Sequence, residues 1–314
     1  MLVLTNEQKL KILDALLKNR ETYGGNNKQF AIRWGINPQV YSTVSKNRNV
    51  NKKITDAKWA EIAWKLNVPL EERKWNTVRT RVFSHIEEDI LFCKAYGKSR
   101  MLVDECAIGK TYTAEYLART LDNCFYVDCS QCTGKTEFIR TLATAIGAEA
   151  SGRLADIKGN IKYVLKAIPK PIVILDEAGD LEYNAFKLLK EFWNATRDCC
   201  GWYMMGADGL RTKINNGMNK TQMPGYRELF SRFSSKFDHV VPRDSRDRIE
   251  FYRNLVYSVI SANEEDEAIV KRVTNRCLNT DSETNETGLR RAEALLILEL
   301  KQKYDCDGSE NRTI

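Results

Sequence analysis

The sequence predicts an α/β core, a parallel sheet with flanking helices, placed between two all-helical regions. Five short β-rich runs alternate with helical stretches between residues 85 and 242: SRMLV, CFYVD, PIVILD, GWYMMG and FDHVV. Such alternation favours a parallel sheet covered by helices on both faces. Outside this region, apolar residues recur at helical spacing. We therefore expect a helical domain at 1–66, a solvated linker at 67–84, the core at 85–242, a helical region at 243–305 and a flexible tail at 306–314.

Composition narrows the class of protein. The 314 residues are 43% hydrophobic and 29% charged, as in water-soluble globular proteins. No apolar run reaches the roughly 18 residues of a membrane span, and the N-terminus lacks the pattern of a signal peptide. The odd number of cysteines, 9, favours reduced thiols, so we expect a cytoplasmic location and no membrane partner. Cys129 and Cys132 have a zinc-like spacing, but no second pair of ligands accompanies them.

The first 66 residues predict four short helices. Thr5, Asn37 and Thr55 are candidate caps, and Pro38 occupies the first position of the third helix. Two helices joined by a Gly-Ile-Asn turn form a helix-turn-helix pattern, which resembles the small DNA-binding domains of phage repressors. Outward residues of the third helix that could reach DNA are Gln39, Ser42, Thr43 and Lys46. A polar helical bundle or a protein-docking domain is the alternative interpretation.

Two Gly-Lys-Thr triplets are candidates for a phosphate loop. Gly109-Lys110-Thr111 follows the run SRMLV, and a second triplet with Lys135 follows CFYVD. A phosphate loop needs a strand before it and a helix after it, so that backbone N–H groups surround the phosphates. Lysine then neutralises the β- and γ-phosphates, and the hydroxyl of Thr111 holds Mg²⁺.

Topology favours Lys110. The apolar run PIVILD ends in Asp176-Glu177, the pattern of an aspartate that organises Mg²⁺ followed by a glutamate that activates water. In doubly wound ATPases another βα unit lies between the phosphate loop and that strand. If Lys110 marks the phosphate loop, CFYVD and its helices form this unit; if Lys135 does, no strand lies between. Asp104 stands where the motif has glycine, and with Glu105 it places acids beside an anion site. A degenerate fold that binds no nucleotide is therefore the alternative.

The order DECAIGKT, IVILDEAGDL, GWYMMGADGL, ELFSRF and GLRR resembles the AAA+ ATPases of DNA transposition, the MuB, IstB and TnsC group. The resemblance implies ATP and Mg²⁺ as cofactors, Glu177 as catalytic base, and residues 243–305 as a lid. It implies that Arg232 is an arginine finger acting on a neighbouring subunit, with Arg227 as alternative. Arg290, with Arg291 as alternative, matches the sensor arginine of the lid. After the fourth strand such ATPases have a small polar residue; here the position is held by Ala207, or by Asp208 one place on, which puts efficient hydrolysis in question.

The resemblance also implies double-stranded DNA, further copies of the chain in a filament or ring, and a transposase as partners. Lys135, Arg153 and Lys158 lie where such ATPases line their central channel, and contacts to phosphates there would be tolerant of sequence. The net charge of +7 is compatible with a polyanion. Two alternatives stay open: an AAA+ helicase loader or other DNA-remodelling ATPase, and a phage-type transcription regulator with a vestigial nucleotide site.

Overall fold

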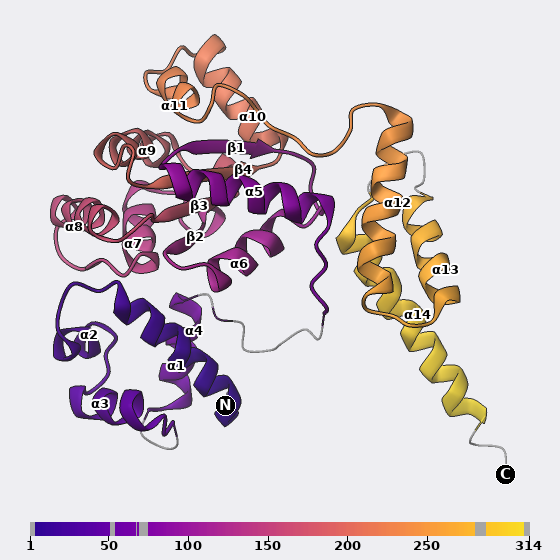
Figure 1. The fold of residues 1–314 in the computed structure, drawn as a ribbon, viewed down its shortest axis with the longest axis horizontal. Helices are drawn as coiled ribbons and strands as arrows, with labels where there is room; N and C mark the ends of the chain where they lie inside the picture. Colours follow the sequence, from indigo (N-terminus) through magenta and orange to yellow (C-terminus); the bar gives the residue numbers. More distant parts are fainter. Residues whose placement is uncertain (1–3, 51–53, 67, 69–74, 280–286, 311–314) are drawn as a thin grey trace.

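A computed structural model describes residues 4–50, 54–66, 68, 75–279 and 287–310, with side chains up to residue 301. It contains an α/β core, an N-terminal helical domain beneath it and a C-terminal helical lid beside it (Figure 1). Within these ranges, no helix is both long and apolar enough to cross a bilayer.

The core is built on four parallel strands in the order β1-β4-β3-β2. The register sets Val103 beside Gly206 and Asp128 beside Asp176, so the carboxyl ends of the strands meet at one edge. Consecutive residues of a strand face opposite sides, and here both sides are covered. The strands are β1 (Ser99–Val103), β2 (Cys124–Asp128), β3 (Ile172–Asp176) and β4 (Gly201–Gly206).

Helices cover both faces of this sheet, as predicted (Figure 1). One face packs against α5 (Arg81–Tyr96) and α6 (Lys110–Thr120). The other packs against α7 (Lys135–Ala145), α8 (Leu154–Ala167), α9 (Tyr183–Ala195), α10 (Asp208–Asn215) and α11 (Tyr226–Arg232). The sequence-based boundary at residue 85 falls inside α5, whose first turn is capped by Thr80.

The fifth predicted strand, FDHVV, is present only as a single bridge. Asp238 pairs in parallel with Leu102 beside β1, and its backbone exchanges hydrogen bonds with Met101 and Val103. The ladder stops there because the N–H groups of Val240 and Val241 donate to the side chain of Asp104, at 2.5 and 3.1 Å. The Asp104 side chain thus takes the place of a β1 carbonyl as the acceptor for these N–H groups.

The N-terminal domain contains the four predicted helices around a core of its own. They are α1 (Asn6–Glu21), α2 (Asn27–Arg33), α3 (Pro38–Asn47) and α4 (Asp56–Lys65), with Thr5, Asn37 and Thr55 capping as expected. The domain contacts the core through α1 and α2: Lys18 donates to carbonyls at the end of α6, Asn19 to Thr144, and Arg33 to the carbonyl of Gly147.

The segment before α5 is exposed or half-buried, and it makes specific contacts with its neighbours. The backbone N–H of Asn76 donates to Asn263 at 2.5 Å, its side chain donates to the Ala262 carbonyl at 2.6 Å, and Trp75 packs against the lid. Arg79 forms an ion pair with Glu87 at 2.5 Å. Residues 67 and 69–74 lie outside the described part of the chain.

The lid consists of α12 (Ser245–Ser261), α13 (Glu267–Leu278) and α14 (Leu289–Glu310). Helix α14 continues through residues 306–310, which we expected in the flexible tail. Gly308 does not end it, since one glycine inside a helix costs only about 1 kcal/mol. Residues 311–314 are outside the described ranges.

Candidate nucleotide site

The loop between β1 and α6 has the geometry of a phosphate loop. Gly109 adopts a left-handed conformation, with φ 98°, immediately before α6 begins at Lys110. The buried Lys110 ammonium points back into the loop, where it donates to the carbonyls of Asp104 (2.9 Å) and Glu105 (2.5 Å). Thr111 is exposed in the first turn of α6. The positive end of the helix and the lysine thus face the same loop, as an anion site requires.

The two acids at the end of β3 lie near this loop. Asp176 is buried, and its carboxylate accepts hydrogen bonds from the Tyr126 hydroxyl (3.1 Å) and from the Glu177 backbone (3.0 Å). Glu177 is left-handed, with φ 46°. Burial raises the pKa of its carboxyl, Asp176 adds to the rise, and Lys110 opposes it. A raised pKa suits a general base, because proton transfer is most efficient when the pKa lies near the working pH.

The second triplet has different surroundings. Gly134 is extended, with φ −80° and ψ 154°, so the chain does not wrap back around an anion there. The carboxylates of Glu137 and Glu182 lie beside it, about 3.5 and 4.0 Å from where a Cβ on Gly134 would be. Carboxylates repel phosphate, so the geometry favours Lys110 as the phosphate-binding lysine.

Asp104 and Glu105 do not face the anion site, although the sequence places them beside it. Asp104 is 7% exposed, and its carboxylate accepts three backbone N–H groups, those of Glu105, Val240 and Val241. Glu105 points to the lid, where it contacts Arg248 and Tyr252. Nothing requires glycine at position 104: among the loop residues, Ala107 and Gly109 have positive φ and Asp104 does not.

The start of α14 closes the loop from the lid side. The N–H of Leu289 donates to the Ala107 carbonyl at 2.7 Å, and a Cβ on Gly288 would lie 2.8 Å from that oxygen. Arg290 follows directly and is exposed. Arg291 instead donates to two carbonyls at the end of α13, at 3.3 and 3.4 Å. The end of α13 thus holds the guanidinium of Arg291. Arg290 follows Leu289, which contacts the loop, and is the better candidate for the nucleotide.

No polar side chain stands at the end of β4, where Ala207 follows Gly206. Asp208 is exposed and forms an ion pair with Arg211 at 3.4 Å. The Arg211 guanidinium also donates to the carbonyl of Val103, the last residue of β1, at 3.2 Å. Arg211 therefore brings a positive charge to the end of β1 that leads into the phosphate loop.

Arg232 lies near the amino end of β1, away from the phosphate loop. Its guanidinium stacks 5.2 Å over Trp193 and donates to Asn194 at 3.0 Å. The Trp193 indole donates to Ser99, the first residue of β1, whereas the phosphate loop follows the last residue. A strand rises about 3.3 Å per residue, so Arg232 does not reach the nucleotide of its own chain. With Arg197 it lines an open hollow of about 530 Å³. Arg227 is exposed nearby.

The predicted DNA-binding residues differ in their surroundings. Gln39, Ser42 and Lys46 are exposed on α3, and Thr43 is partly buried, its hydroxyl donating to the Gln39 carbonyl. Lys135 and Arg153 are exposed at the starts of α7 and α8. Lys158 forms an ion pair with Glu191 on α9 at 3.0 Å, which Lys162 shares at 2.6 Å. The charge of Lys158 is thus largely committed within the chain.

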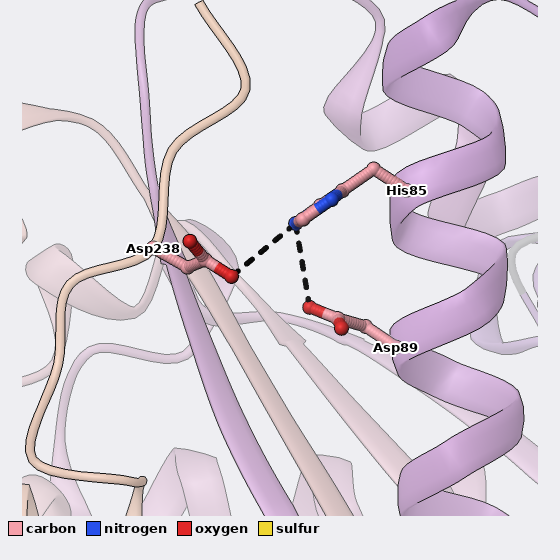
Figure 2. Close-up of side chains that lie close together, drawn as sticks. All are labelled: His85, Asp89 and Asp238. Carbon is pink, nitrogen blue, oxygen red and sulfur yellow. Dashed lines mark ion pairs between the residues drawn. The ribbon is translucent and has the colours of Figure 1, made fainter.

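Figure 2 shows a cluster of three side chains between α5 and the segment that contains Asp238, which pairs with β1. His85 Nε2 lies 3.6 Å from Asp89 and 3.4 Å from Asp238. In the described ranges these are the ligand atoms grouped closely enough to hold a metal ion. However, Arg100 already pairs with Asp89, and Lys236 pairs with Asp238 at 3.2 Å. We interpret the cluster as a polar contact between the Asp238 segment and α5, in which Arg100 and Lys236 balance the two carboxylates.

Sequence reasoning missed three contributors. They are Tyr126, whose hydroxyl donates to Asp176; Arg211, which donates to Val103; and Glu105, which contacts the lid. Tyr126 could have been found from the alternation in CFYVD, which places its side chain on the same face as Asp128, two residues on. Nothing local to Arg211 indicates its contact with Val103, and nothing local to Glu105 indicates its contacts with α12.

A match to a family model agrees with this geometry. A family model described as an AAA domain matches residues 93–214, which include the phosphate loop and the acids after β3. No curated protein matches the chain in sequence. A solved structure titled "Closed State CryoEM Reconstruction of Hsp104:ATPyS and FITC casein" is 14% identical with a TM-score of 0.38; the match covers 95% of this chain and 61% of that one.

The family match therefore supports an AAA-type P-loop ATPase domain at residues 93–214. The family match covers β1, β2, β3 and β4 with the helices between them.

Proposed function

We propose that this AAA ATPase is an ATP-dependent, largely sequence-nonspecific double-stranded DNA-binding protein of transposition. In this proposal it uses Mg²⁺, assembles on DNA as a filament or ring in the cytoplasm, selects the target and activates a transposase. The observation that carries the nucleotide part is the convergence of Lys110, Asp176 and Glu177 at one edge of the sheet. Lys110 would neutralise the phosphates, Thr111 and Asp176 would hold the metal, and Glu177 would accept a proton from water.

Arg232 supports assembly because its own chain offers it no nucleotide. It is held by Trp193 and Asn194 beside an open hollow, near the amino end of β1 and away from the phosphate loop. A guanidinium in such a place is useful in catalysis only if another subunit brings its phosphates there. Arg290 would contact the nucleotide from the lid of the same chain.

DNA binding is supported by exposed polar and basic side chains on two elements. Gln39, Ser42 and Lys46 lie on α3, a helix that packs on the N-terminal domain through Tyr41 and Val44. Lys135 and Arg153 offer further charges for phosphates. Because phosphate contacts release counterions, binding through them would weaken steeply with salt.

Electron microscopy of the full chain with duplex DNA, with and without ATP, tests the proposal. We expect filaments or rings on DNA that depend on ATP. Isolated protein in both conditions would refute it. Binding to a replicative helicase would favour a loader, and a sequence-specific footprint without ATP would favour a transcription regulator.

A salt titration of DNA affinity locates the contacts. Lys46→Ala and Lys135→Ala should each lower the slope of log K against log salt by about 1, if each lysine meets one phosphate. Lys271→Ala is the matched control, because it removes the same charge from α13, where Lys271 pairs with Glu267 at 2.7 Å. If the slopes of Lys46→Ala and Lys135→Ala equal that of the Lys271→Ala control, Lys46 and Lys135 do not contact DNA.

A further inference from the structure

Asp104 and Glu105 occupy the start of the phosphate loop, where they contact the lid and its connection rather than the anion site. We propose that the two carboxylates are positioning residues that couple nucleotide binding at the loop to the position of the lid. This inference rests on the proposed role of Lys110 at the phosphates.

Asp104 holds the connection between core and lid. One carboxylate oxygen accepts the N–H groups of Val240 and Val241, at 2.5 and 3.1 Å, between the bridge at Asp238 and the start of α12. Both valines and Asp104 are buried. Hydrogen bonds to an ionised acceptor in a buried place are among the strong ones, so this connection follows the loop when the loop moves.

Glu105 holds the first helix of the lid. Its two carboxylate oxygens lie 2.5 Å from Arg248 and 2.5 Å from the Tyr252 hydroxyl. These partners are four residues apart and therefore lie on one face of α12. Burial and the hydrogen bond to Glu105 raise the pKa of Tyr252.

Lys110 connects these contacts to the nucleotide. Its ammonium donates to the main-chain carbonyls of the same two residues, Asp104 and Glu105, whose side chains hold the lid. An ammonium has three N–H donors. Two of them are used by these carbonyls and one is left for a phosphate oxygen. A phosphate that draws the ammonium toward it therefore acts on the backbone at 104–105 through these two hydrogen bonds. The carboxylates transmit this effect to the hinge at 240–241 and to α12.

The lid has a second contact with the same loop, which makes a concerted response possible. The Ala107 carbonyl accepts the N–H of Leu289, directly before Arg290. A movement of α12 relative to α14 therefore changes where Arg290 stands with respect to the phosphates. The acid pair and the Leu289 contact together thus set where Arg290 stands with respect to the loop.

The test compares Glu105→Ala, Arg248→Ala and the double variant with the wild type in the full chain. Nucleotide affinity is measured with a fluorescent ATP analogue, and lid response as the change in hydrogen exchange of residues 238–256 when a non-hydrolysable ATP analogue with Mg²⁺ is added. We expect each single variant to weaken affinity by about five-fold or more, the lower end of typical coupling between sites. The double variant should be no weaker than either single variant, and the exchange response should disappear.

Glu250→Gln is the matched control, since it removes one negative charge from an exposed position on α12. It should bind and respond as the wild type does. Effects of Glu105→Ala and Arg248→Ala that multiply, together with an unchanged exchange response, would overturn the inference. Tyr252→Phe provides a second route: it removes one hydroxyl from a well-packed ring, and it should lower the exchange response while circular dichroism stays unchanged.

Lys110→Ala separates this inference from the proposed function. If it keeps wild-type affinity, both fail, because the lysine does not meet the phosphates. If it loses nucleotide while the Glu105 and Arg248 effects multiply, only the coupling fails.

Discussion

Replacing Asp104 by glycine, the residue that the phosphate-loop motif has at this position, should destabilise the protein. The carboxylate accepts three backbone N–H groups, at 2.8 Å from Glu105, 2.5 Å from Val240 and 3.1 Å from Val241. The Glu105 backbone is only partly buried, so water can replace its acceptor. The two valines are buried, and glycine leaves their N–H groups without a partner.

Each buried N–H without a partner costs about 1–3 kcal/mol, so Asp104→Gly should lower the free energy of unfolding by about 2–6 kcal/mol. In a unit of core and lid size, 1 kcal/mol corresponds to about 2–4 °C in Tm. We therefore expect Tm to fall by about 4–24 °C in thermal unfolding followed by circular dichroism. Asp104→Asn keeps one carbonyl oxygen for the valines and should give an intermediate value.

Asp122→Gly is the control, because Asp122 is exposed and lies in the turn before β2. It should leave Tm nearly unchanged. An Asp104→Gly variant as stable as the wild type, with tighter ATP binding, would refute the reasoning. That result would mean that the carboxylate faces the phosphates and repels them.

The remaining predictions concern nucleotide chemistry. Lys110→Ala should abolish binding of a fluorescent ATP analogue whereas Lys135→Ala keeps it, and the reverse result would select the other triplet. Glu177→Gln should bind ATP but hydrolyse it about 10²–10⁴-fold more slowly in a steady-state assay, and an unchanged rate would remove Glu177 from the role of base. Since the pKa of Glu177 is raised, hydrolysis should decline as pH falls through that pKa, at a higher pH than for an exposed glutamate; an acid limb typical of an exposed glutamate would contradict this. Arg232→Ala should bind ATP without hydrolysing it, and mixing it with Glu177→Gln should restore part of the activity where an intact Glu177 site meets an intact Arg232; mixed assemblies as inactive as either variant would exclude action in trans.

Much of the fold was predictable because its signals are local. Thr5, Asn37 and Thr55 cap the helices that follow them, and each cap acts within about three residues. The four strands reported above coincide with apolar runs that end in turn residues. The position of Lys110 relative to β1 and α6 also follows from a short motif.

The fifth strand shows where local reasoning failed. FDHVV has the composition of a strand, yet Asp104 captures the N–H groups that would extend the ladder. Residue 104 is 136 positions away from Val240, so no window of sequence contains both. For the same reason the sequence could not predict that Lys158 is paired with Glu191 on another helix.

By itself the sequence determined the helices, the parallel core and the positions of the candidate phosphate loop and its two acids, because capping, periodicity and short motifs act over a few residues. Only the tertiary structure decided what Asp104 and Glu105 do. Beside the loop in sequence they suggest repulsion of phosphate, but in space they hold the hinge and α12, across separations of 136 and 147 residues. The direction in which a carboxylate points depends on which donors the fold brings to it, and most of these donors lie at least 136 residues later in the chain.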